Sequence, residues 1–337
     1  MKIPVQEIIH HLGEAQNIII TAHKNPDGDA LGSTLGLYHA LQNAGKNCTV
    51  VLPDGFPSFI AWMPSADKIL LFDSMKEKVV EQFKKADLVF CLDYNSLDRT
   101  GELSAVIQDC PAPRILIDHH PFPSDEFNVL YSDTFPSSTS EMVVEMLLAV
   151  QWGQMIDEKS ATCLYTGIVT DTGSFRFSCT SSRTHEIAGQ LIQRGAANAH
   201  IHDLLFDTQS ESRLKLLGYA LSEKMIVNHA LKTAYIVLTQ AELKRFHYRK
   251  GDTEGMVNYG LAIQGIKVAA IFVEHEELIK ISLRSKGKVP VNELSRNYFS
   301  GGGHTNAAGG KWEGDLESLL KKWNEVLPPF INEHGEK

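Results

Sequence analysis

Cysteine and long apolar runs are both scarce in this sequence, and each shortage excludes a class of protein. The five cysteines are scattered through 337 residues, and none of them stands in a C-x-x-C pair. An odd, scattered set predicts neither a disulfide framework nor a zinc ribbon. No apolar run approaches the roughly 20 residues of a membrane-spanning helix, and Met1–Val5 lacks the apolar core of a signal peptide. We therefore expect a cytoplasmic protein that does not associate with a membrane.

Basic residues are in the minority. The chain carries 32 Lys and Arg against 41 Asp and Glu, which gives a formal net charge of −9 at pH 7. A protein that binds long duplex nucleic acid neutralises many phosphates and needs an excess of Lys and Arg to do so. The composition therefore argues against a long duplex as a partner, but it leaves room for a small basic pocket that binds a short anionic ligand.

The hydrophobic pattern of the first 195 residues predicts an α/β domain. With 43% hydrophobic and 22% charged residues, the chain can bury ordinary cores, and its length suffices for two domains. Apolar strands predicted at 17–22, 47–52, 87–92 and 114–117 alternate with helices predicted at 5–14, 30–43, 75–85 and 103–108, before further helices at 138–152, 158–169 and 184–194. This alternation is typical of a mostly parallel sheet covered by helices.

A second, smaller mixed α/β domain is predicted over residues 226–337, after a helical linker at 196–225. Its predicted strands are 233–238, 268–274 and 278–284, and its predicted helices are 240–246, 291–298 and 316–327. Pro328 is expected to end the last of these helices.

Three potential metal ligands, His23, Asp27 and Asp29, follow the first predicted strand. Pro26 and Gly28 predict a turn here, so the three side chains are expected on a loop at the carboxyl end of a buried strand. Open α/β sheets place their ligand sites at such ends, and an imidazole with two carboxylates suits a divalent metal. A turn that uses Asp and Gly for backbone reasons is the alternative interpretation.

Further acidic and histidine residues follow other elements: Asp93, the triplet Asp118-His119-His120, and Asp171. A carboxylate at the end of a buried strand is costly unless a positive group compensates it, although Asp93 could instead cap a helix. Strand ends that point the same way converge on one edge of a parallel sheet. The gathered donors exceed what one cation requires and match what two require, as in sites where paired cations activate water for attack on phosphorus.

These motifs resemble those of the DHH phosphoesterase superfamily. His23-x-x-x-Asp27-x-Asp29, Asp93, Asp118-His119-His120 and Gly167-x-x-x-Asp171 match its four motifs in order. Gly301-Gly302-Gly303-His304 is similar to the glycine-rich signature of the DHH-associated substrate-binding domain. The resemblance therefore runs from residue 23 to residue 309.

The resemblance implies a site with two divalent cations, for which Mn²⁺ fits best and Mg²⁺ is the alternative. It implies that His23 and Asp27 hold one cation, that Asp29, His119 and Asp171 hold the other, and that Asp93 bridges them. Asp118 is then a supporting carboxylate that orients a histidine. His120 is expected to contact the scissile phosphate or to protonate the leaving oxygen.

Residues of the second domain are expected to bind the substrate. The glycine run lets backbone N–H groups approach an anion, so Gly302, Gly303 and His304 are candidates, with a flexible turn as the alternative. Arg284 ends the predicted strand 278–284 near Lys286 and Lys288, where a solvated hairpin tip is the alternative interpretation. The resemblance implies that Arg284 contacts a substrate phosphate.

Within the superfamily, the chain is similar to the short, two-domain group of nanoRNases and 3′-phosphoadenosine 5′-phosphate phosphatases. The expected activity is hydrolysis of very short RNA from one end and conversion of 3′-phosphoadenosine 5′-phosphate to AMP. A phosphodiesterase for linear or cyclic dinucleotides is the alternative. A non-catalytic nucleotide-sensing module is disfavoured, because the expected ligand set is complete. Whether the chain forms a homodimer stays open.

Overall fold

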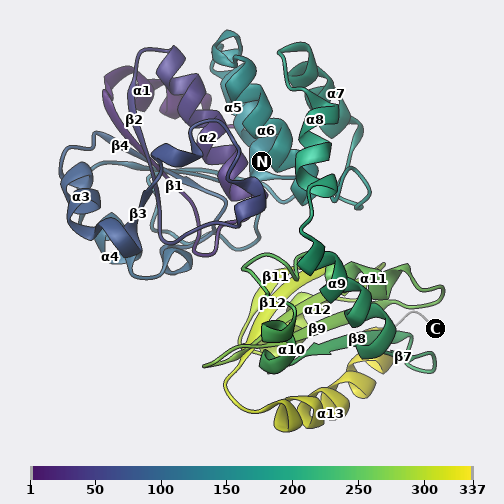
Figure 1. Cartoon of the computed structure of the whole chain (residues 1–337). Helices are drawn as coiled ribbons and strands as arrows, with labels where there is room; N and C mark the ends of the chain where they lie inside the picture. The colour runs from purple at the N-terminus through teal and green to yellow at the C-terminus, as the bar shows by residue number, and fades with distance from the viewer. Residues whose placement is uncertain (1–2, 335–337) are drawn as a thin grey trace. The chain divides into compact units, whose positions relative to one another are not determined.

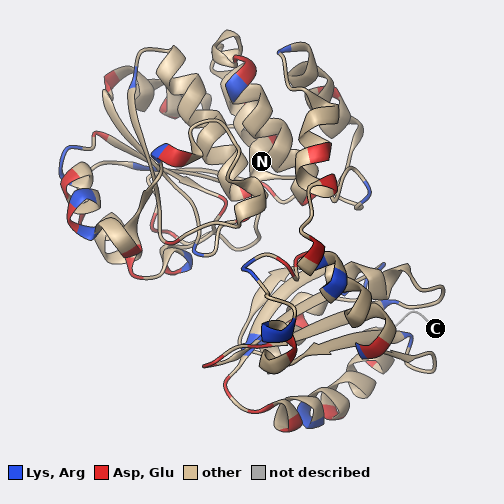
Figure 2. Cartoon of the chain, in the orientation of Figure 1, with Lys and Arg blue, Asp and Glu red and all other residues tan. Residues whose placement is uncertain are grey.

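The computed structural model describes residues 3–334 and consists of two compact units, Met1–Thr208 and Gln209–Lys337. The boundary lies inside the range 196–225. Figure 2 shows acidic and basic residues interspersed over the helices and loops of both units. Within residues 3–334, no helix combines the length and apolarity needed to cross a membrane.

The first unit is built on a six-stranded sheet in the order β3-β2-β1-β4-β5-β6, and all its neighbouring strands are parallel (Figure 1). This confirms the predicted α/β architecture. Two short strands, β3 and β6, were not expected from the sequence. The strands are β1 (Asn17–Thr21), β2 (Asn47–Leu52), β3 (Leu70–Leu71), β4 (Leu88–Leu92), β5 (Arg114–Asp118) and β6 (Val129–Ser132).

Helices cover both faces of this sheet, because alternate strand residues enter different cores. Ile18 and Ile20 of β1 belong to one core, and Ile19 belongs to the other. The first core takes side chains from α1 (Val5–Glu14), α2 (Gly28–Asn43), α5 (Thr139–Ala149), α6 (Glu158–Asp171), α7 (Ser182–Gln193) and α8 (Asn198–His202). The second core takes side chains from α3 (Phe72–Lys84) and α4 (Leu103–Asp109).

Helices α2 and α6 pack with their backbones unusually close. A Cβ atom on Gly32 would lie 2.6 Å from the carbonyl oxygen of Cys163 and 2.8 Å from Cα of Gly167. A Cβ atom on Gly28 would collide with the side chain of Thr170. Gly28 is the first residue of α2 and packs closely against Thr170 of α6, whereas the sequence predicted that it lies in a turn. This packing brings the start of α2 beside the end of α6.

The second unit has a mixed six-stranded sheet in the order β11-β12-β10-β9-β8-β7, in which only β8 and β9 pair in parallel among the described strands. Its strands are β7 (Met225–Asn228), β8 (Thr233–Leu238), β9 (Val268–Glu274), β10 (Ile279–Ser285), β11 (Gly302–His304) and β12 (Ala307–Trp312). Helices α12 (Val291–Tyr298) and α13 (Leu316–His334) contribute to one core of this unit. Helices α9 (Glu211–Tyr219), α10 (Gln240–Arg245) and α11 (Met256–Ala262) contribute to the other.

The prediction that Pro328 ends the last helix is wrong. Helix α13 continues through Pro328 and Pro329 to His334. Phe330, beyond both prolines, is buried in the same core as Trp323 and Leu327. Burying this apolar face compensates for the hydrogen bonds that the prolines remove from the helix.

Candidate metal centre

The predicted ligands of the first unit gather at one edge of its parallel sheet. His23, Asp93 and Asp118 stand at the carboxyl ends of β1, β4 and β5, which are neighbours in the sheet. Asp29 lies in the first turn of α2 and not on the loop that was predicted, whereas Asp171 is the last residue of α6, at the helix end where the sequence placed it. The close packing of these two helices brings both carboxylates to the same edge.

His23, Asp27 and Asp93 form a first group, in which one donor atom from each residue lies within 4.8 Å of the others. Nε2 of His23 is 3.5 Å from Oδ2 of Asp93, and its Nδ1 is 2.9 Å from the carbonyl oxygen of Lys24. Asp27 caps α2, since its Oδ1 accepts hydrogen bonds from the N–H groups of Asp29 and Ala30. Burial alone would lower the pKa of His23, but the hydrogen bond to Asp93 and the nearby carboxylates raise it to about 9.

Asp29, His119 and Asp171 form a second group with the same spacing. Nε2 of His119 is 3.6 Å from Oδ2 of Asp171 and 4.0 Å from Oδ2 of Asp29. The Asp29 carboxylate accepts hydrogen bonds from the backbone N–H groups of Thr139 (2.7 Å) and Ser140 (2.9 Å) at the start of α5. Burial and the charge of Asp93 nevertheless raise the pKa of Asp29 well above its usual range.

Asp93 lies between the two groups. Its Oδ2 faces His23, while its Oδ1 is 3.6 Å from Nε2 of His119 and accepts a hydrogen bond of 3.1 Å from Oγ1 of Thr139. Its backbone has φ of 64°, a left-handed conformation that aspartate tolerates better than most residues. Burial would raise the pKa of this carboxyl, but the hydrogen bond and charge of His23 and the charges of other imidazoles hold it below its usual range. Asp93 caps no helix, so the alternative role considered for it is excluded.

Asp118 and His120 form a buried pair beside Asp93. Nδ1 of His120 is 2.7 Å from Oδ1 of Asp118 and 3.7 Å from Oδ1 of Asp93. Burial would lower the pKa of His120, but Asp118 outweighs burial and raises it. The second oxygen of Asp118, Oδ2, is buried and has no hydrogen-bond partner within residues 3–334. Asp118 therefore holds His120 in orientation.

The chemistry of this cluster fits divalent cations. Asp29 and Asp93 are 1% and 2% exposed, and within residues 3–334 histidines are their only ion-pair partners. Closely spaced, buried carboxylates repel one another and lose hydration, and a bound cation offsets both costs while the carboxylates stay ionised. Their oxygen donors, with one imidazole in each group, suit Mn²⁺ or Mg²⁺.

Two residues that hold this site in place, Thr139 and Ser140, were not singled out from the sequence, and Gly167 was noted only as the first residue of the motif that contains Asp171. Thr139 and Ser140 anchor Asp29, and Thr139 also contacts Asp93. The polar run 137–141, between a short strand and an apolar helix, was the signal available for both. Gly167 lets α6 approach α5 and α2, because a Cβ atom there would collide with Oγ of Ser140 and lie 2.9 Å from Oδ1 of Asp29.

In the second unit, two of the four candidate substrate residues, Arg284 and His304, lie in one row of the sheet. Ala307 of β12 is the register partner of Arg284 in β10 on one side and of His304 in β11 on the other. Gly302 and Gly303 also belong to β11, so the glycine run is an edge strand and not the open loop that was expected. Gly303 has φ of 137°, which explains the need for glycine there. Arg284 and His304 thus stand on either side of the same residue, about two strand spacings (~10 Å) apart.

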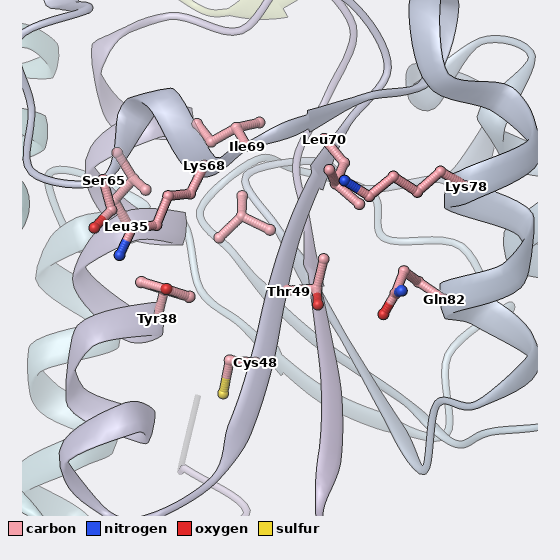
Figure 3. Close-up of a pocket in the computed structure, with 11 residues that line it drawn as sticks. Leu35, Tyr38, Cys48, Thr49, Ser65, Lys68, Ile69, Leu70, Lys78 and Gln82 are labelled. Atoms are coloured by element: carbon pink, nitrogen blue, oxygen red, sulfur yellow. The ribbon is translucent and has the colours of Figure 1, made fainter.

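The pocket drawn in Figure 3 lies in another part of the first unit. It has a volume of about 200 Å³ and is lined by residues of α2, β2 and α3, among them Tyr38, Thr49 and Lys78. None of the candidate metal ligands lines it. The candidate chemistry therefore belongs to the strand-end edge and not to this pocket.

Imidazoles and carboxylates that surround a shared carboxylate at the edge of a parallel sheet are typical of metal-dependent hydrolases. Comparison with known proteins gives the family. The DHH family, N-terminal domain, matches residues 17–168, and the DHHA1 domain matches residues 232–328. The chain belongs to the DHH family of phosphoesterases.

Curated relatives match almost the whole chain. It is 30% identical to the bifunctional oligoribonuclease and PAP phosphatase NrnA of Bacillus subtilis, over 94% of this chain and 98% of the relative. It is 30% identical to the protein of the same name from Thermus thermophilus, over 94% of this chain and 91% of the relative.

Solved structures show a similar fold. An exopolyphosphatase-related protein from Bacteroides fragilis has a TM-score of 0.94 at 38% identity, covering 98% of this chain and 97% of that one. RecJ of Thermus thermophilus in complex with Mn²⁺ shares the fold alone, with a TM-score of 0.54 at 14% identity over 98% of this chain and 55% of that one.

Proposed function

We propose that this chain hydrolyses very short RNA oligonucleotides from one end and converts 3′-phosphoadenosine 5′-phosphate to AMP. The relatives from Bacillus subtilis and Thermus thermophilus carry both activities in their names and match this chain along nearly its full length. Both substrates present a phosphoester to the same kind of site, so one centre serves both reactions.

The position of Asp93 is the observation that carries the proposal. Its two oxygens face different imidazoles, with 3.5 Å from Oδ2 to His23 and 3.6 Å from Oδ1 to His119. Each imidazole belongs to a separate three-residue group. A carboxylate placed in this way can bridge two cations, and paired cations are the arrangement that serves attack on phosphorus.

In this proposal, His23, Asp27 and Asp93 hold one cation, and Asp29, His119 and Asp171 hold the other. When bound, the pair of cations lowers the pKa of water toward neutrality and offsets the charge that develops on the phosphoryl oxygens. Thr139 and Ser140 fix the carboxylate of Asp29 through their N–H groups, so its direction does not depend on the metal. We propose Mn²⁺ as the resident ion, because the donor set combines imidazole nitrogen with carboxylate oxygen.

His120 is proposed to act on the substrate. Asp118 holds its Nδ1, which leaves Nε2 to donate a hydrogen bond to a phosphate oxygen or a proton to the leaving oxygen. Arg284, Gly302, Gly303 and His304 are proposed to bind the part of the substrate that the metal centre does not hold.

A phosphodiesterase for linear or cyclic dinucleotides is the second candidate. Cyclic-di-AMP phosphodiesterase GdpP of Geobacillus thermodenitrificans is 27% identical over 88% of this chain, but this chain covers only 45% of that protein. The full-length match to the NrnA relatives favours the first candidate.

A substrate panel tests this proposal. The purified chain with Mn²⁺ is given 3′-phosphoadenosine 5′-phosphate, di- to pentaribonucleotides, cyclic dinucleotides and pyrophosphate. The proposal predicts the highest kcat/KM for the short linear RNAs and for 3′-phosphoadenosine 5′-phosphate. A preference for cyclic dinucleotides would assign the second candidate function, and hydrolysis of pyrophosphate alone would contradict both.

A further inference from the structure

One short segment, residues 136–140, leads into α5 and holds three of the proposed metal ligands by hydrogen bonds. Two of its backbone N–H groups donate to the carboxylate of Asp29 at 2.7 and 2.9 Å, and its threonine hydroxyl donates to Asp93 at 3.1 Å. The carbonyl oxygen of Pro136 accepts a hydrogen bond from the imidazole of His119. The directions of these three side chains therefore depend on what holds the segment itself.

The next residue, Glu141, is a buried acid that the proposed function does not use. It is 2% exposed, it belongs to none of the candidate metal groups, and within residues 3–334 it forms no ion pair with a basic side chain. Burying such a group costs free energy unless hydrogen bonds offset the cost. One oxygen, Oε2, accepts three hydrogen bonds, from the N–H of Ser137 (3.1 Å), from Oγ of Ser137 and from Oγ1 of Thr184 (2.9 Å). Two of the three therefore come from the segment that holds the ligands.

The bond from the Ser137 N–H acts directly on the peptide unit that contacts His119. The N–H of Ser137 and the carbonyl group of Pro136 belong to one planar peptide unit. Glu141 accepts a hydrogen bond from one side of this unit, and His119 donates one to the other side. Because Nε2 of His119 faces the carboxylates of the metal centre, Nδ1 is the atom that donates to the carbonyl oxygen. Glu141 thus orients the group that fixes the tautomer of His119 and presents the lone pair of Nε2 to a cation.

The segment is also closed at its other end and tied to a second helix. Ser138 is the N-cap of α5, and its Oγ accepts a hydrogen bond of 3.0 Å from the N–H of Glu141. In a capping box, the third helical residue reaches back to the N–H of the N-cap, whereas Glu141 reaches one residue further, to Ser137. Thr184 lies in the first turn of α7, so its bond to Oε2 joins the start of α5 to the start of α7. The turn is therefore fastened to the body of the first unit.

We propose that Glu141 is a positioning residue, which holds residues 136–140 in the conformation that directs the three ligands at the cations. This inference rests on the proposed function, because it concerns the same metal centre. Its requirement is a hydrogen-bond acceptor at the position of Oε2, since that one oxygen makes all three bonds. The amide oxygen of glutamine supplies such an acceptor, and leucine, which has a similar size, supplies none.

Calorimetric titration of the folded variants with Mn²⁺ tests this role. Glu141→Leu should raise the Kd for Mn²⁺ about 10- to 100-fold, the usual effect of removing an outer partner of a metal ligand, whereas Glu141→Gln should keep the wild-type Kd. Ser137→Ala, which removes one of the three donors, should raise Kd by a smaller factor. Glu145→Leu is the matched control, because Glu145 lies one turn further along α5 and accepts hydrogen bonds from Arg183 (3.1 Å) and Tyr131 (3.0 Å). The control should lower Tm and leave Kd unchanged.

Hydrogen exchange of the metal-free chain gives a second readout, which does not depend on bound metal. The amides of Thr139 and Ser140 donate to Asp29, so their exchange rates report whether the segment keeps its conformation. Both amides should exchange faster in Glu141→Leu and at the wild-type rate in Glu141→Gln.

Four results would overturn the role of Glu141. They are an unchanged Kd in Glu141→Leu, an equal rise in Kd in Glu145→Leu, an equal rise in Glu141→Gln, and unchanged exchange of both amides. If Glu141→Leu does not fold, Ser137→Ala decides, and a wild-type Kd in that variant would overturn the role as well. A wild-type chain that binds no Mn²⁺ would contradict the proposed function instead, and the exchange rates would still decide the role of Glu141.

Discussion

Replacing Asp93 with asparagine should separate the folding of the first unit from its binding of metal. Asparagine keeps the size of the side chain and tolerates the left-handed backbone, where φ is 64°. Oγ1 of Thr139 can still donate to the amide oxygen. The substitution removes the attraction between this charge and His23, which costs stability, and also its repulsion with Asp29, which restores stability, so the metal-free variant should fold and melt near the wild type.

The expected effect of metal follows from mass action. A ligand at 100 times its Kd stabilises the folded state by about 2.7 kcal/mol, so two sites contribute about 5 kcal/mol. For a domain of this size, each kcal/mol raises Tm by about 2–4 °C, so saturating Mn²⁺ should raise the wild-type Tm by roughly 10–20 °C. Asp93→Asn should lose more than half of that rise, because it weakens both sites. Its kcat should fall at least about a hundredfold, the lower end of the loss for one transition-state contact.

Thermal unfolding with and without Mn²⁺, together with turnover of a diribonucleotide, measures both effects. Asp87→Asn is the matched control, because Asp87 precedes β4 as Asp93 follows it. The Oδ2 atom of Asp87 accepts hydrogen bonds from the N–H groups of Gln16 (3.1 Å) and Asn17 (2.8 Å) at the opposite edge of the sheet. The control should keep the full Mn²⁺-induced rise and the wild-type kcat. An Asp93→Asn variant that also keeps both would refute the bridging role.

Three further predictions concern other parts of the chain. Gly167→Ala should destabilise the first unit by roughly 1–3 kcal/mol and weaken Mn²⁺ binding, because the new Cβ atom would crowd Asp29; unchanged Mn²⁺ affinity by calorimetry would contradict this. Burial opposes ionisation of Glu242, but its ion pair with Lys224 and its cap hydrogen bonds lower its pKa from 4.5 to about 2. That carboxylate therefore stabilises the second unit above about pH 4.5, by up to about 3 kcal/mol, and this contribution is lost as pH falls toward 2. Glu242→Gln should melt lower at pH 7 and converge with the wild type at pH 2, so a Tm difference that is constant with pH would contradict the assignment. Arg284→Ala should raise KM at least about tenfold without loss of bound metal, as expected for a charged hydrogen bond to substrate, and loss of metal would contradict its proposed role.

The architecture of the first unit could be predicted because its longer strands are recognisable in the sequence. Strands β1, β4 and β5 are apolar runs that lead to His23, Asp93 and Asp118. A carboxylate at the end of a buried strand is costly to desolvate, so it indicates that a positive group compensates it. Parallel strands then place all these ends at one edge. Strand β3 has two residues, Leu70–Leu71, and such a short run carries no periodic signal.

The support of the site could not be predicted, because it depends on tertiary contacts. Nothing local in the sequence indicates that the N–H groups of Thr139 and Ser140 hold Asp29, which is 110 residues away from Thr139. The glycines of α2 are consistent with close packing against another helix, but Gly28 also fits a turn. Only the close approach of Thr170 shows why a side chain is excluded there.

Two predictions for the second unit were wrong for the same reason: tertiary packing overrides the conformational preference of the local sequence. Pro328 and Pro329 disfavour a helix, yet burial of Phe330 extends α13 past them. The run Gly301–Gly303 favours an open loop, yet the pairing of β11 with β12 makes it part of a sheet. A Cβ atom on Gly303 would lie 2.5 Å from the carbonyl oxygen of Ala307, so glycine permits that pairing.

Anomalous diffraction at the manganese edge, from crystals grown with Mn²⁺, tests the central claim most directly. The account predicts two peaks about 3.5–4 Å apart, one on each side of the Asp93 carboxylate. The first should be bounded by His23 and Asp27, and the second by Asp29, His119 and Asp171. A single peak, or two peaks that do not share Asp93, would contradict the account.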